Sequence, residues 1–233
     1  MRVLTLLILL LLMFSIVGYS NVFKDIKNES DAKKMYEYYK EQFSKDKNNY
    51  ENAWKLCAYA RFYGFYFVKD KGTRESLFEE AKNAGETAVK LNPNGVEGNY
   101  FLGVAYGSLA QERGVMNSLF LAGPIVENMT KAIKKDPSYR DGAAYIVRAN
   151  VYSKAPGWPV SVGDVNKAIS DFENAIKYNN KVAYRYYAEF LINRGEKAKA
   201  REMIQKGLSL TLDEPVIDEY ETKVLKDLLE KVK

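Results

Sequence analysis

The feature that most constrains this chain is a pattern of small and bulky apolar residues that recurs four times between about residues 51 and 212. It is clearest in the second copy, where Leu102, Gly103 and Tyr106 are followed by Ala132 and Pro137. Small residues at fixed positions let neighbouring helices approach closely, and bulky residues fill the remaining space because protein interiors are close-packed. Such a recurrence predicts stacked helical units.

The second half of each copy repeats one spacing of seven residues, in the pairs Ala81/Ala88, Ile125/Ala132, Ala168/Ala175 and Ala200/Gly207. Together with the Leu-Gly-x-x-Tyr run and the later Ala and Pro, this pattern resembles the tetratricopeptide repeat, a helix-turn-helix unit of about 34 residues. We therefore expect an all-α, tetratricopeptide-repeat-like solenoid of about four helical hairpins. The repeats are expected at about 51–94, 95–139, 140–180 and 181–212.

Single helices are expected on both sides of the repeats. Ser30 is a candidate N-cap for a helix that runs to about Phe43. Pro215 can open a capping helix over 215–232, whose Lys and Glu residues suit a solvated outer face. No linker interrupts the chain, so 21–233 is expected to form a single domain.

The first three repeats carry extended insertions between their two helices. Trp54 and Ala81, for example, lie 27 positions apart, where an ordinary repeat has about 16. The insertions are apolar, with Phe65 to Val68, Leu119 to Leu121 and Trp158 among their residues. They either form an apolar edge, typical of a ligand chamber or a subunit interface, or lengthen the helices into a taller core.

The first 20 residues have the features of a targeting segment. Arg2 precedes the apolar stretch 3–17, and Gly18-Tyr19-Ser20 provides the small residues typical of a cleavage site. We expect 1–20 to be a signal peptide cleaved after Ser20, with an uncleaved anchor as the alternative. Export to the periplasm or cell envelope follows. Cys57 lies far from this stretch, so the chain is not expected to be a lipoprotein.

The composition offers little for catalysis. The chain has no histidine and one cysteine, which removes the usual neutral-pH base and the common zinc sites. Acidic pairs such as Glu79-Glu80 and Glu219/Glu221 lie in lysine-rich stretches and are interpreted as solvated faces. The formal net charge of +5 is mild and dispersed, which does not favour nucleic acid. We expect neither an enzyme, nor a cofactor, nor a metal site.

Three segments add a more specific resemblance, namely 97–107, 124–139 and the element Pro156-Gly157-Trp158-Pro159 with Gly163-Asp164. Together they resemble the T component (TatT-like) of tetratricopeptide-repeat-associated TRAP transporters, over roughly 52–207. This resemblance implies an envelope protein that docks the periplasmic solute-binding protein of a TRAP transporter. It also implies a small hydrophobic ligand and a homotrimer as possible partners.

Candidate binding residues follow from the groove-facing positions of the first helix in each repeat. They are Tyr59, Phe62, Tyr100, Val104, Ile146, Asn150 and Arg185, and Trp158 joins them as a core plug or interface anchor. The aromatic ones have core packing as an equally good interpretation. The sequence thus predicts a non-catalytic exported accessory of a TRAP-type uptake system, with a general envelope scaffold for proteins or peptides as the alternative.

Overall fold

A computed structural model describes residues 21–232, without the side chains of 115–117. Within this part of the chain ten α-helices follow one another: α2 (Glu29–Lys45), α3 (Tyr50–Phe67), α4 (Lys71–Leu91), α5 (Val96–Arg113), α6 (Val115–Lys135), α7 (Ala143–Lys154), α8 (Val165–Ile176), α9 (Lys181–Asn193), α10 (Lys197–Leu208) and α11 (Pro215–Lys231). The predicted signal peptide at 1–20 lies outside the described residues.

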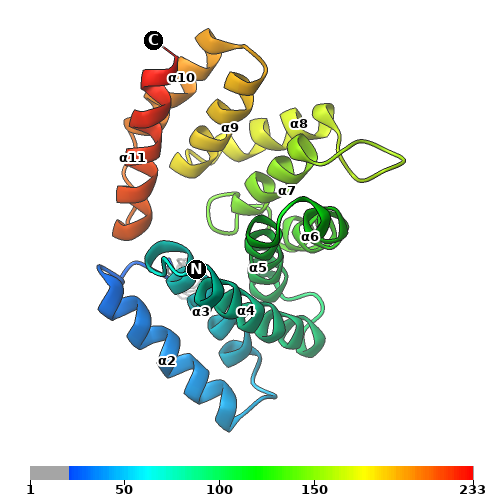
Figure 1. Cartoon of the computed structure of the whole chain (residues 1–233), viewed down its shortest axis with the longest axis vertical. Coiled ribbons are helices and arrows are strands. Elements are labelled where there is room, and N and C mark those ends of the chain that lie inside the picture. The colour runs from blue at the N-terminus through cyan, green and yellow to red at the C-terminus, as the bar shows by residue number, and fades with distance from the viewer. Residues whose placement is uncertain (1–20, 233) are drawn as a thin grey trace, which may run out of the picture.

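The helices pair into four hairpins, α3/α4, α5/α6, α7/α8 and α9/α10, which stack in chain order (Figure 1). Helix α2 packs on α3 at one end, and α11 packs on α9 and α10 at the other. The expected all-α architecture of four hairpins between two single helices is confirmed.

Close helix packing depends on the small residues of the repeat pattern. A Cβ atom placed on Gly85 of α4 would lie 3.0 Å from the Cys57 sulfur and 3.1 Å from the Cα atom of Leu102. Ala81 and Ala88 of the same helix are fully buried. The repeat signature therefore marks the contacts between hairpins.

Two of the three insertions lengthen helices. Helices α3 to α6 have 18 to 21 residues, whereas α7 to α10 have 12 or 13. Only Gly114, at φ 83°, separates α5 from α6. The third insertion instead forms a loop over 155–164. The taller-core interpretation holds for the first insertion, whose residues Phe65 to Val68 are half-buried. The second and third insertions keep exposed apolar residues, namely Phe120 and Trp158.

The start of α2 corrects the predicted cap. The helix begins at Glu29, and the side chain of Asn28 accepts a hydrogen bond from the amide of Asp31. Asn28 is therefore the N-cap in place of Ser30, which lies inside the first turn. Both residues are good caps, and the sequence pattern did not distinguish between them.

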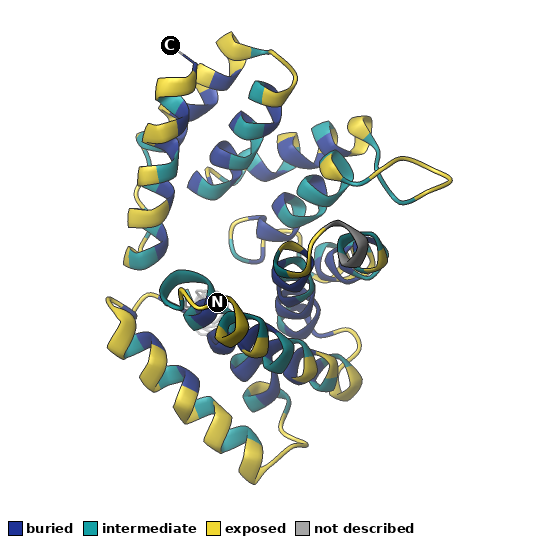
Figure 2. Ribbon diagram, in the orientation of Figure 1, coloured by how far each residue is buried: buried dark blue, intermediate teal, exposed yellow. Residues whose placement is uncertain are grey.

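The exposed residues of α2 follow its outer side (Figure 2).

Helix α11 begins at Pro215, as predicted, but its inner face is not purely apolar. Glu221 is 2% exposed, so the interpretation of this residue as part of a solvated face is wrong. The Arg185 guanidinium lies 2.8 Å from the Glu221 carboxylate and compensates its burial. Glu79, by contrast, is half-buried and pairs with Lys82 and Arg113.

The solenoid curves until its two ends meet. The ring of Tyr220 in α11 lies 5.6 Å from the ring of Phe65 and 5.4 Å from that of Tyr66, both in α3. The first helices of the hairpins thus face an interior that α11 closes (Figure 1). Among the described helices, none has the length and apolar character to cross a membrane.

Candidate functional site

The concave face holds two adjoining cavities of about 150 and 300 Å³. Their walls come from α3, α5, α7, α9, α11, the segments before the last three of these helices, and the N-terminal residues Asn21 and Phe23. None of the lining residues lies in α4, α6, α8 or α10. We name the smaller one the inner cavity and the larger one the outer cavity. Val104, Ile146 and Arg185 line both.

Tyr59 and Phe62, two predicted groove residues, are covered by the chain's own N-terminal segment, 21–26. Phe23 of this segment stacks on Phe62 with 4.2 Å between ring centroids and meets the edge of Tyr59 at 5.5 Å. The Tyr59 hydroxyl donates a 2.8 Å hydrogen bond to the carbonyl oxygen of Val22. Burial raises the pKa of Tyr59, so it stays a neutral donor.

Tyr100 and Ile146 form the floor of the inner cavity and are largely buried, at 9% and 2% exposure. The ring of Tyr100 packs edge-on against Phe101 and Tyr139. Core packing therefore accounts for most of the surface of both side chains, and a charged substitution at either would disrupt the fold before it tested binding.

Val104 and Asn150 are half-buried and line the outer cavity. Of the predicted groove residues, these two present the most free surface to a ligand. Their role in binding stays a prediction.

Arg185 was predicted as a polar groove residue, and the structure places it at the cavity wall in a buried ion pair. Its guanidinium binds the Glu221 carboxylate at 2.8 Å and Glu189 at 3.1 Å, and it lies 3.5 Å from the ring centroid of Tyr186. Burial opposes the charge, but the neighbouring rings and carboxylates raise the pKa of Arg185 well above its ordinary value.

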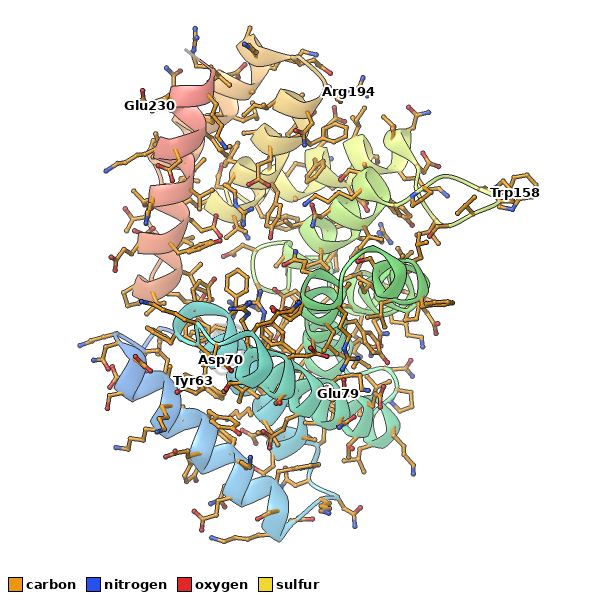
Figure 3. The ribbon with its side chains drawn as sticks, in the orientation of Figure 1. Tyr63, Asp70, Glu79, Trp158, Arg194 and Glu230 are labelled. Atoms are coloured by element: carbon orange, nitrogen blue, oxygen red, sulfur yellow. The ribbon has the colours of Figure 1, made fainter. Side chains whose placement is uncertain are left out.

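Trp158 is separate from the groove. It lies at the tip of the 155–164 loop, 89% exposed, and points away from the body of the protein (Figure 3). The loop is held at its base by hydrogen bonds from the amide of Gly163 to the Pro156 carbonyl and from the amide of Asp164 to the Tyr152 carbonyl. The core-plug interpretation of Trp158 is wrong, because the insertion carries it outward.

Arg61 is a groove residue that the sequence analysis missed. Its Nε atom donates a 3.0 Å hydrogen bond to the Ser108 hydroxyl, and its guanidinium lies 4.2 Å from the ring centroid of Phe65. No carboxylate of the described residues pairs with it. The repeat alignment contains a signal for this residue, since the equivalent positions carry Tyr106, Tyr152 and Leu191.

The second missed feature is an ion pair between Arg140 and Glu214 behind the N-terminal segment. Arg140 Nη2 lies 2.9 and 2.7 Å from the two Glu214 carboxylate oxygens. Burial opposes the charge of Arg140, but the Glu214 carboxylate outweighs it and raises the Arg140 pKa. No local sequence pattern predicts this ion pair, because its two residues lie 74 positions apart.

The described residues of the groove offer hydrogen bonding, charge and apolar surface. Within the described residues, no group of three or more His, Cys, Asp or Glu side chains is placed to hold a metal ion. Cys57 is fully buried, and burial raises the pKa of its thiol, which removes its nucleophilic form.

Two solved structures are similar to this fold. The thermophilic TPR protein TTC0263 of Thermus thermophilus is 15% identical with a TM-score of 0.64, over 87% of this chain and 91% of that one. MamA is 21% identical with a TM-score of 0.52, over 78% of this chain and 89% of that one. These likenesses show a tetratricopeptide-repeat-like fold.

At the level of sequence, no curated protein matches the chain. A family model does match, over residues 22–145, which include the N-terminal segment, the first two hairpins and the start of α7. Its description is RMD1-3, regulator of microtubule dynamics protein 1-3, and the chain belongs to this family.

Proposed function

We propose that this protein is a non-catalytic scaffold that binds an extended, acidic segment of a partner protein along its concave face. The observation that carries the proposal is the half-buried Arg61 guanidinium, which faces both cavities without a carboxylate partner among the described residues. A half-buried cation of this kind favours an anionic ligand group, since a charge-assisted hydrogen bond there is partly shielded from water.

The charges around the outer cavity support the same ligand. Its walls carry Arg61, Lys154 and Arg185 against the single carboxylate of Glu189. Arg185 is already bound to Glu221 and Glu189. Lys154 is exposed and has no ion-pair partner in the described part of the chain. Arg61 and Lys154 therefore remain to attract carboxylates, and Asn150 and Gln111 offer hydrogen bonds to a main chain beside them.

The general scaffold role was the alternative in the sequence analysis, and it agrees with the fold of the two similar structures. The narrower role, docking a solute-binding protein of a TRAP transporter, rests on the motif resemblance alone, because the family that matches the chain is a different one. A small hydrophobic ligand and a homotrimer rest on the same resemblance. Export rests on the apolar stretch 3–17.

The test is capture of partners from an envelope extract of the native host by the tagged protein, with mass spectrometry of the eluate. We expect Arg61→Glu to abolish capture of the specific partner. Lys34→Glu, which makes the same type of change at an exposed lysine of α2, is expected to leave capture intact. A solute-binding protein in the wild-type eluate would favour the transporter role. Equal capture by all three proteins would contradict the groove as the binding site.

A further inference from the structure

The N-terminal segment, residues 21–26, packs on the concave face in the manner of a bound peptide and forms part of the wall of the inner cavity. Phe23 is 6% exposed and is enclosed by the rings of Phe62 and Tyr59 and by the Arg140 guanidinium, which lies 5.3 Å from its ring centroid. Ile26 is 3% exposed. Residues 22–25 form a turn outside any helix.

The concave face binds both polar groups of the peptide bond that joins Val22 to Phe23. The Tyr59 hydroxyl donates to the carbonyl oxygen of Val22, and the amide of Phe23 donates a 3.1 Å hydrogen bond to Glu214 Oε1. Asn21 also bonds to Asp213 through its side chain. Contacts to main-chain atoms do not depend on the side chains of the occupant, so another segment with the same backbone conformation can make them equally well.

The segment fills its site incompletely. A cavity of about 150 Å³ remains beside Phe23. One nitrogen at this site, Arg140 Nη1, is buried and meets no hydrogen-bond acceptor among the described residues. An unpaired buried donor is costly, so an occupant with an oxygen placed opposite Arg140 would fit the site better than the chain's own segment does.

We propose that residues 21–26 are an internal ligand that occupies the partner site and that a partner segment must displace. The occupant that fits is a peptide turn with an aromatic side chain in place of Phe23 and an oxygen acceptor for Arg140. This inference rests on the proposed scaffold function and deepens it. The inner cavity supplies the aromatic pocket, and the adjoining outer cavity, which shares Arg61 with it, supplies the charge.

Self-occupation lowers the apparent affinity of the site for any external peptide. Only the fraction of molecules with a displaced segment can bind, and the apparent dissociation constant rises by the inverse of that fraction. Removing the Phe23 ring weakens the internal ligand and leaves the pocket residues unchanged.

The experiment measures binding of a fluorescent synthetic peptide that matches residues 21–29 to the full chain, by fluorescence anisotropy. We expect the Phe23→Ala protein to bind this peptide at least about tenfold more tightly than the wild type does. Adding Tyr59→Phe to that variant, which removes only the hydroxyl that holds Val22, is expected to weaken binding by about fivefold. A control peptide with alanine at the Phe23 position is expected not to bind.

Equal binding to wild type and to a Phe23→Ala protein of normal helical content would overturn the inference, as would equal binding of the two peptides. Hydrogen exchange of the wild-type protein tests it independently of any variant. We expect the amides of Phe23 and Ile26 to exchange faster than those in the centre of α3, through local opening. Exchange at the rate of α3 would make the segment an integral part of the core and would overturn the inference too.

The two proposals fail separately. If Arg61→Glu abolishes partner capture while the peptide binds no form of the protein, the scaffold function stands and the internal ligand does not. If the peptide binds the Phe23→Ala protein but the Arg61→Glu protein captures partners as well as the wild type does, the pocket exists and the acidic-segment scaffold is wrong.

Discussion

At the residue scale, the unusual feature of this protein is the number of charged side chains in its interior. Three acidic residues at the start of α11 or within it each contact a basic residue from the segments around α7 and α9. The pairs are Glu214 with Arg140, Asp218 with Lys181, and Glu221 with Arg185. These pairs fix the position of α11 as well as its depth, because an ion pair has a defined geometry and apolar contact does not.

We expect Glu221→Gln to lower the free energy of unfolding by about 3 kcal/mol or more, because the substitution leaves Arg185 buried beside a neutral side chain. The partly exposed Glu189 compensates only in part. Urea denaturation followed by circular dichroism measures the loss.

The matched control for that substitution is the double variant Arg185→Met with Glu221→Leu. Because it replaces both members of the buried pair with apolar groups of similar volume, we expect a stability within about 1 kcal/mol of the wild type. A double variant less stable than Glu221→Gln would contradict this account of the pair.

At the element scale, short polar signals decide where helices begin. The side chain of Asn28 caps α2, that of Asp70 caps α4 by accepting from Thr73, and that of Asp164 caps α8 by accepting from Lys167. Each of these three helices therefore starts one residue after a side chain that can accept a hydrogen bond from an unpaired amide of the first turn.

The two candidate caps of α2 are expected to behave differently. Asn28→Ala should lower the free energy of unfolding by about 1 kcal/mol, since the amide of Asp31 loses its acceptor. Ser30→Ala should change it by less than about 0.5 kcal/mol, because Ser30 is an exposed residue of the first turn. Thermal denaturation of both variants under one buffer decides between them, and a larger effect at Ser30 would restore the cap predicted from the sequence.

At the scale of the whole molecule, curvature brings the first hairpin against the last helix. Residues 191 positions apart meet in the hydrogen bond between the Phe23 amide and Glu214. Closure encloses the concave face, so the cavities there are bounded on several sides. Phe120 and Trp158 lie outside the closed face and are 75% and 89% exposed.

Substitutions of the two tryptophans are expected to change the melting temperature by different amounts, because Trp54 packs in the body of the protein and Trp158 lies on the exposed loop. Trp54 is half-buried and stacks on Phe101 at 5.6 Å, so Trp54→Ala should lower the melting temperature by several degrees. Trp158→Ala should leave it within about 1 °C, since almost no surface of Trp158 is buried. Differential scanning calorimetry of both variants is the measurement. A large loss at Trp158 would mean that the loop packs on something in solution, and light scattering would show whether that is a second copy.

The sequence by itself determined the elements and their order. Local periodicity and small residues such as Ala81, Ala88 and Gly103 specify hairpins that stack, because neighbouring repeats contact each other in chain order. The repeat pattern also predicted that most of the candidate groove residues lie on the concave face, since a given repeat position has the same orientation in every hairpin.

The tertiary structure alone decided what occupies and closes that face. The small rotation at each repeat accumulates along the solenoid, and no single repeat encodes the sum. Glu221 becomes buried against Arg185 because α11 packs on α9, and the amide of Phe23 reaches Glu214 because the solenoid closes. The sequence pattern alone could not reveal that the groove holds the chain's own N-terminal segment, because that contact joins the two ends of the molecule.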